Sequence, residues 1–139
     1  YHTLIGEPAA PAKARQNQRF VVVLKMTEPQ PQFGRVIVAD YLPAGFEIDN
    51  PKLVSSGETS ALAWIADGVE PVNSEFRDDR FTAAFERKQD ASPVFTVAYV
   101  VRAVSPGRYV LPQAIVEDMY RPDRFGRTAT GAIEIQAAK

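Results

Sequence analysis

Short apolar runs with a two-residue period, separated by proline and glycine, restrict the fold of this chain more than any other feature. The sequence has 11 Pro and 8 Gly, which interrupt regular structure at short intervals. Between them alternate residues are apolar, as in strands that bury one face. In residues 19–27, one such face is formed by Phe20, Val22, Leu24 and Met26. The pattern predicts an all-β fold.

The spacing of these runs predicts an antiparallel β-sandwich of the immunoglobulin type with seven or eight strands. We expect strands over residues 19–27, 35–41, 75–87, 93–104, 109–111, 113–120 and 132–136, with shorter extended segments at 1–4 and 46–48. Residues 7–18 contain prolines and are expected to form a loop. Residues 59–67 could form at most one short helix, and Trp64 within them is expected to plug a core.

Length and charge limit the domain count and the partners. A chain of 139 residues fits a single domain over residues 1–139. The 16 Lys and Arg residues are balanced by 17 Asp and Glu residues, so the sequence lacks the basic excess of a nucleic-acid-binding protein. No apolar run approaches the roughly 18 residues that a membrane-spanning helix needs, and we expect no membrane contact by this domain.

The residue types that most enzymes use are nearly missing. There is no cysteine and only one histidine, His2, which excludes thiolate catalysis, disulfides and thiolate zinc sites within this chain. A relay through imidazole needs a rigidly held ring, and His2 lies in a terminal segment. We therefore expect no enzyme activity, no cofactor and no metal. The absence of cysteine does not distinguish the cytoplasm from the periplasm.

Paired carboxylates offer the main catalytic alternative. Asp78 and Asp79, and likewise Glu117 and Asp118, are adjacent. On a strand, adjacent side chains point to opposite faces and cannot share a substrate. A small hydrolase that uses Asp78 or Asp118 is therefore the least favoured hypothesis.

Two surface features could contact a partner. Glu75, Arg77 and Asp79 alternate in charge, which indicates either an exposed charge ladder or a surface matched to a charged partner. Met119 and Tyr120 end an apolar strand, just before a loop that begins at Arg121. A thioether beside a large aromatic ring can cap a core or cover a partner's surface, and the residue types leave both interpretations open.

Three segments together resemble the C-terminal domain of the bacterial α2-macroglobulin family. They are residues 40–51, 75–81 and 116–122, which read Asp-Tyr-Leu-Pro-Ala-Gly-Phe-Glu-Ile-Asp-Asn-Pro, Glu-Phe-Arg-Asp-Asp-Arg-Phe and Val-Glu-Asp-Met-Tyr-Arg-Pro. The resemblance extends from about Arg19 onward. It implies a macroglobulin-type β-sandwich that forms the C-terminal fragment of a much larger periplasmic lipoprotein, a protease inhibitor that traps proteases.

The resemblance also implies partners and contact residues. In this family a protease cuts a bait segment, and a Cys-Gln thioester in a neighbouring domain is then exposed to the lysines of the protease. The last domain packs on the thioester domain and shields the thioester until cleavage. The implied contact residues are Met119 and Tyr120, with Glu75, Arg77, Asp79 and Arg121 as further partner-facing candidates. The expected partners are the thioester domain and other domains of the same parent chain, and proteases through the parent.

One departure and one alternative accompany the resemblance. This chain has no cysteine, so the covalent step belongs to another domain. Some family members lack the thioester cysteine, and in such a parent the shielding role would be void. The alternative function is a structural or adhesive immunoglobulin-like module of a cell-surface protein.

Overall fold

A computed structural model describes residues 1–49, 64–69 and 71–138 of the protein. Within these ranges there are strands and no helices, which confirms the all-β prediction, and so nothing helical there could cross a membrane. The eleven strands are β1 (Lys13–Arg15), β2 (Arg19–Thr27), β3 (Gly34–Tyr41), β4 (Phe46–Ile48), β5 (Asn73–Arg77), β6 (Arg80–Arg87), β7 (Val94–Ala103), β8 (Gly107–Leu111), β9 (Ala114–Asp118), β10 (Phe125–Arg127) and β11 (Gly131–Gln136).

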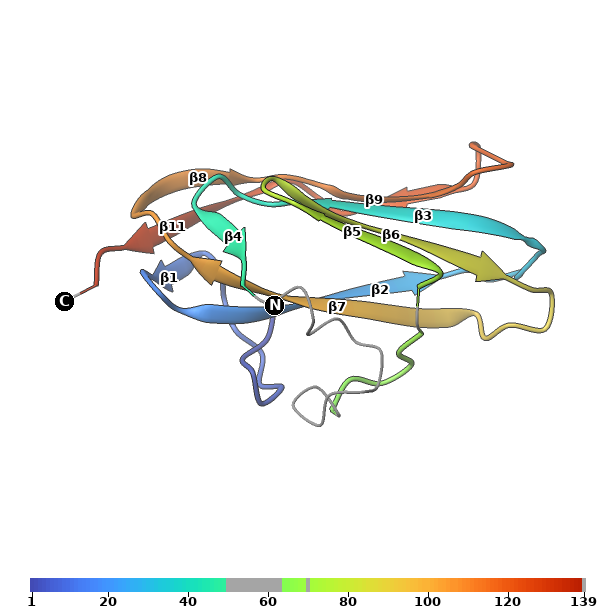
Figure 1. Ribbon diagram of the computed structural model, residues 1–139, viewed down its shortest axis with the longest axis horizontal. Coiled ribbons are helices and arrows are strands. Elements are labelled where there is room, and N and C mark those ends of the chain that lie inside the picture. Colours follow the sequence, from blue (N-terminus) through green and yellow to red (C-terminus); the bar gives the residue numbers. More distant parts are fainter. Residues whose placement is uncertain (50–63, 70, 139) are drawn as a thin grey trace.

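The strands form two facing layers, as the sandwich prediction requires (Figure 1). A five-stranded sheet with the order β10-β9-β3-β6-β5 faces a three-stranded sheet with the order β2-β7-β4. A third sheet, β1-β11-β8, lies at the end of the molecule that carries the C-terminus. Strand β1 runs parallel to β11 and every other pair of neighbouring strands is antiparallel.

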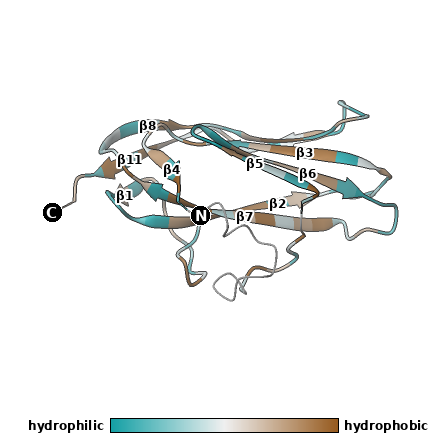
Figure 2. Ribbon diagram, viewed as in Figure 1, coloured by the Kyte–Doolittle hydropathy of each residue, from teal (hydrophilic) through white to brown (hydrophobic). Residues whose placement is uncertain are grey.

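The predicted alternation fills the space between the two layers. Strands β2, β3 and β7 contain hydrophobic stretches (Figure 2). Their inward side chains pack into one cluster with those of the neighbouring strands. The largest fully buried side chains of this cluster are Phe20, Phe81, Phe85, Phe95 and Tyr99.

The structure differs from the sequence prediction in the short elements. Residues 75–87 form a hairpin, β5 and β6, rather than one strand, because Asp78 and Asp79 make the turn between them. The expected loop 7–18 contains β1, whose Ala14 is fully buried. Residues 1–4 pair only through isolated bridges of His2. Most of the possible helix at 59–67 lies outside the described residues.

A second, smaller apolar cluster covers the outer face of the β2-β7-β4 sheet. Val21, Ala98 and Val100 are fully buried there, under Trp64 and neighbouring side chains. The Trp64 indole Nε1 donates a hydrogen bond to the Leu4 carbonyl at 3.1 Å. Trp64 is therefore a plug, as expected from the sequence, but over this outer cluster rather than in the main core.

Tyr99 and Asp40 form a polar contact inside the main core. The Tyr99 hydroxyl on β7 donates a hydrogen bond across the sandwich to the Asp40 carboxylate on β3. Asp40 is 7% exposed and Tyr99 is fully buried. Burial raises the pKa of the Asp40 carboxyl, and the hydrogen bond from Tyr99 opposes this rise only in part.

The raised pKa of Asp40 makes a predictable contribution to the pH dependence of stability. The folded state holds the Asp40 proton more tightly than the unfolded state, in which the pKa of an aspartate is about 3.9. The free energy of unfolding therefore falls as pH rises from about 4 to the raised pKa, with a slope of about 1.4 kcal/mol per pH unit between the two pKa values. Asp40→Asn removes this contribution, so the free energy of unfolding should fall less over this pH range than it does in the wild type. Urea unfolding between about pH 3.5 and 8 measures it, and parallel profiles for the two proteins would contradict the assignment.

Candidate interaction site

Met119 and Tyr120 begin the loop between β9 and β10, residues 119–124, and both face solvent. Met119 is 47% exposed and Tyr120 is 71% exposed. The Met119 amide still donates a hydrogen bond to the Arg35 carbonyl on β3 at 2.8 Å. The backbone at Met119 is therefore bonded to the sheet, although its side chain is exposed. The exposure of both side chains argues against the core-cap interpretation.

The local sequence explains the shape of this loop. The Asp118 carboxylate oxygen Oδ1 accepts hydrogen bonds from the backbone amides of Tyr120, at 2.9 Å, and Arg121, at 3.2 Å. This is the turn that an aspartate side chain stabilises by bonding to the backbone two residues later. The loop closes when the Arg124 amide donates to the Arg121 carbonyl at 2.9 Å. Asp118 therefore fixes the backbone turn at Tyr120, where the chain departs from strand β9.

A network of side chains with alternating negative and positive charge connects this turn to the opposite layer. Asp118 Oδ2 lies 3.4 Å from Arg121 Nη1 and 3.5 Å from Arg124 Nη1. Arg124 Nη2 lies 3.0 Å from Glu28 Oε2, and Glu28 Oε1 lies 3.1 Å from Arg87 Nε. The side chains of Asp118 and Arg87 are each 4% exposed. Buried charges need partners of this kind, and here each one has them.

Arg87 has further contacts inside the sandwich. Its guanidinium lies over the Phe95 ring, 3.9 Å from the ring centroid, which is the geometry of a cation–π contact. Its Nη2 donates to the Ser92 carbonyl. The ion network therefore begins in the core and ends in the exposed loop.

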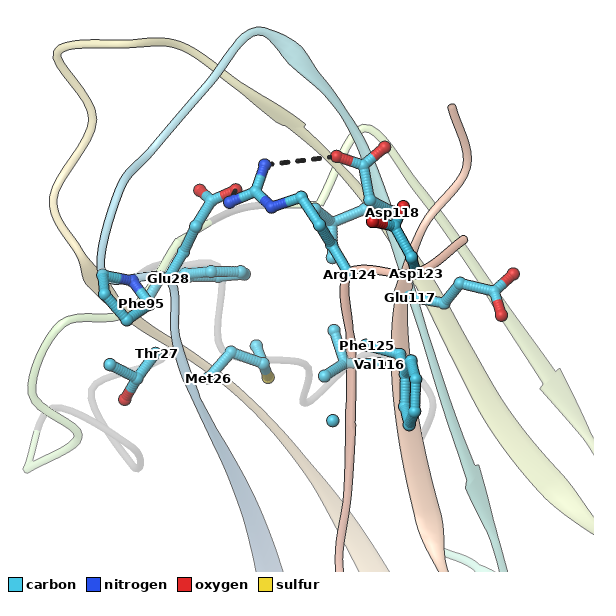
Figure 3. A pocket seen from close by; sticks show the side chains of 13 residues that line it. Met26, Thr27, Glu28, Phe95, Val116, Glu117, Asp118, Asp123, Arg124 and Phe125 are labelled. Carbon is cyan, nitrogen blue, oxygen red and sulfur yellow. Dashed lines mark hydrogen bonds and ion pairs between the residues drawn. The ribbon is translucent and has the colours of Figure 1, made fainter. Parts of the chain in front are cut away.

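A pocket of about 290 Å³ lies beneath this network, between the end of β2 and the β9–β10 hairpin (Figure 3). Its apolar wall includes Met26, Phe95 and Val116, and Arg124 spans the space between Glu28 and Asp118. Both of these carboxylates are bound by guanidinium groups, so neither is free to act as a general base. The arrangement favours a structural role over catalysis.

The charged candidates on β5 lie apart from Met119 and Tyr120. Arg77 Nε pairs with Glu75 Oε1 at 2.6 Å, and both side chains are more than half exposed. Asp79 lies in the following turn, 3.9 Å from Arg80 Nε. Because β5 and β10 occupy opposite edges of the five-stranded sheet, the structure does not bring these residues to the 119–124 loop.

The structure also places the remaining candidates. Arg121 points back to its own domain: Nη1 donates to the Phe33 carbonyl at 3.0 Å and pairs with Asp118. Glu117 is exposed while Asp118 is buried, so this carboxylate pair points to opposite faces, as expected on a strand. Sequence reasoning missed the roles of Glu28 and Arg87. Arg87 follows Phe81, Ala83 and Phe85 at inward positions of β6, and this alternation was the available signal.

Two facing antiparallel sheets define a β-sandwich domain, and here a loop at one edge carries exposed apolar side chains. The chain belongs to the family described as the Bacterial Alpha-2-macroglobulin MG10 domain, whose model matches residues 2–123.

Relatives and solved structures agree with this assignment. Over 97% of its own length, the chain is 36% identical to an alpha-2-macroglobulin of Xylella fastidiosa. It spans 9% of that protein. A crystal structure of a Salmonella alpha-2-macroglobulin mutant superposes on 97% of the chain with a TM-score of 0.80 and 28% identity, covering 9% of that chain. Escherichia coli alpha-2-macroglobulin activated by porcine elastase matches 97% of the chain with a TM-score of 0.77 and 30% identity, covering 12% of that chain.

Proposed function

We propose that this chain is a non-catalytic domain of a bacterial alpha-2-macroglobulin-type protease inhibitor, where it packs on the thioester domain and shields the thioester until the bait is cut. The observation that carries the proposal is the exposure of Met119 and Tyr120 on a loop whose backbone is fixed. Exposed apolar side chains on a rigid support fit a surface that another domain covers.

The chemistry of these two side chains suits the protection of a thioester. A thioester persists where water and amines are excluded. A methionine and a tyrosine ring supply apolar area without a nucleophilic amine, and Asp118 holds the turn that presents them. The parent is proposed to lie in the periplasm, anchored as a lipoprotein, and to engage proteases through its other domains.

The gene of the parent gives a first test of the shielding role. The sequence that precedes this domain should encode a Cys-x-Glu-Gln thioester motif a few hundred residues upstream. A parent without a thioester cysteine would contradict the shielding role and would favour a purely structural domain.

Loss of the two apolar side chains should expose the thioester. In the parent protein, Met119→Ala combined with Tyr120→Ala is expected to speed spontaneous thioester hydrolysis and methylamine incorporation by about tenfold, the factor that corresponds to a loss of about 1.4 kcal/mol of protection. The measurement is the rate of thiol release in the uncleaved parent. Val110→Ala is a matched control, since Val110 is 67% exposed on a different sheet. Equal rates in the wild type and the double variant would refute the role of these residues.

A further inference from the structure

A second exposed aromatic residue lies beside Tyr120, although it comes from a different loop. Phe33 directly precedes β3 and is 65% exposed. Phe33 and Tyr120 line the same shallow hollow of about 260 Å³, which also borders Gly34 and Lys88. Aromatic side chains are enriched in protein interfaces, and two of them exposed around one hollow mark a candidate contact surface.

Arg121 connects the two loops that carry these rings. Its Nη1 donates to the Phe33 carbonyl at 3.0 Å and lies 3.4 Å from Asp118 Oδ2. Asp118 Oδ1 accepts a hydrogen bond from the Tyr120 amide at 2.9 Å. The Arg121 guanidinium thus bonds directly to the Phe33 backbone and is connected to the Tyr120 amide through Asp118. Arg124 adds a second connection, since its Nη2 donates to the Gln30 carbonyl at 3.1 Å.

The two loops approach each other closely at Gly34. A Cβ atom added to Gly34 would lie 3.2 Å from Asp118 Oδ2 and 3.4 Å from Arg121 Nη1. The first distance is tighter than ordinary van der Waals contact and the second is at its edge, so with a side chain at this position the Asp118 carboxylate would have to move by a few tenths of an ångström. The glycine therefore leaves room for the Arg121 contact that joins the loops.

We propose that Phe33 forms one contact surface with Met119 and Tyr120, and that Arg121 is the positioning residue that keeps the two loops in register. The occupant is the thioester domain of the same parent, so this inference rests on the proposed function. Phe33 is continuous with Tyr120 through the shared hollow, and Met119 adjoins Tyr120 in the same loop. The chain spans only 9% of the Xylella fastidiosa relative, so a related parent has ample chain outside this domain to cover it.

Hydroxyl-radical footprinting tests the shared surface. Oxidation rates of Phe33, Met119 and Tyr120 are compared between the 139-residue chain and the uncleaved parent, with Val110 as an exposed reference. We expect all three rates to fall several-fold together in the parent. Protection of Met119 and Tyr120 without protection of Phe33 would overturn the shared surface and leave the proposed function standing. If none of the three is protected, both fail.

Substitutions of Arg121 and Gly34 test the positioning role. In the parent, Arg121→Ala is expected to raise the oxidation rates of both Phe33 and Tyr120 toward those of the free chain, and Arg121→Lys to restore part of the protection. Gly34→Ala removes no polar group and should raise the same two rates. Asp123→Asn is the control, since Asp123 lies in the same loop and forms no ion pair within the described residues. Unchanged protection in Arg121→Ala, or a rise only at Tyr120, would overturn the role of Arg121.

Discussion

Replacing Arg87 by alanine is expected to lower the free energy of unfolding by about 3 kcal/mol. Removal of one partner of a buried ion pair costs about 3–5 kcal/mol, because the other charge stays buried without compensation. Here Glu28 is left in a site where its side chain is 10% exposed. The lower end of the range applies because Arg124 still pairs with Glu28 at 3.0 Å. The contact with the Phe95 ring and the bond to the Ser92 carbonyl are lost as well.

Urea unfolding of the 139-residue chain measures this loss of stability. A variant of an exposed arginine, Arg77→Ala, serves as the comparison. In Arg77→Ala the ion pair with Glu75 is lost from a site where both side chains are more than half exposed. Exposed pairs contribute at most about 1 kcal/mol, so this variant should remain close to the wild type. If Arg87→Ala were no more destabilising than Arg77→Ala, the network would not be a structural anchor.

Asp118→Ala is expected to cost about 2–3 kcal/mol and to loosen the 119–124 loop. The substitution leaves the Tyr120 and Arg121 amides without their acceptor and removes the shared partner of Arg121 and Arg124. Unsatisfied buried groups cost about 1–3 kcal/mol. The ion-pair contribution is discounted because Arg121 and Arg124 are 41% and 27% exposed, and solvent weakens exposed pairs.

Amide hydrogen exchange separates the two roles of Asp118. Asp118→Asn keeps a side-chain oxygen for the turn and loses the charge, so the Tyr120 and Arg121 amides should stay partly protected. In Asp118→Ala both amides should exchange as in an open loop. Equal protection in the wild type and in Asp118→Ala would show that the turn does not depend on this carboxylate.

The layers and most of the longer strands could be predicted from the sequence because they depend on local alternation. Residues 19–27 and β2 coincide, since a strand of nine residues with one buried face carries a clear two-residue period. The turn at Asp78 and Asp79 shows in the sequence only as a shift of the inward positions between Phe76 and Phe81, and β1 is too short to show a period. Strand β1 is held by its pairing with β11, which is far away in the sequence, rather than by its own residues.

The sequence pointed to Met119 and Tyr120 as candidates without deciding whether they are buried or exposed, and it did not show the network that supports them. Met119 and Tyr120 stand out by residue type. Arg87 and Asp118 occupy inward positions of their strands, so burial of a charge could have been anticipated from the alternation. The partners could not, because Glu28 is 59 residues from Arg87 and 96 residues from Arg124. Only the folded arrangement of the two layers brings these side chains together.

The most direct test of the account is a photocrosslink from position 120 in the uncleaved parent. With a photoreactive phenylalanine in place of Tyr120, irradiation followed by mass spectrometry identifies the surface in contact. We predict a crosslink to the thioester domain beside its Cys-Gln bond, and its loss after the bait is cut by a protease. A crosslink to another domain, or no crosslink in the uncleaved parent, would contradict the proposed shielding function.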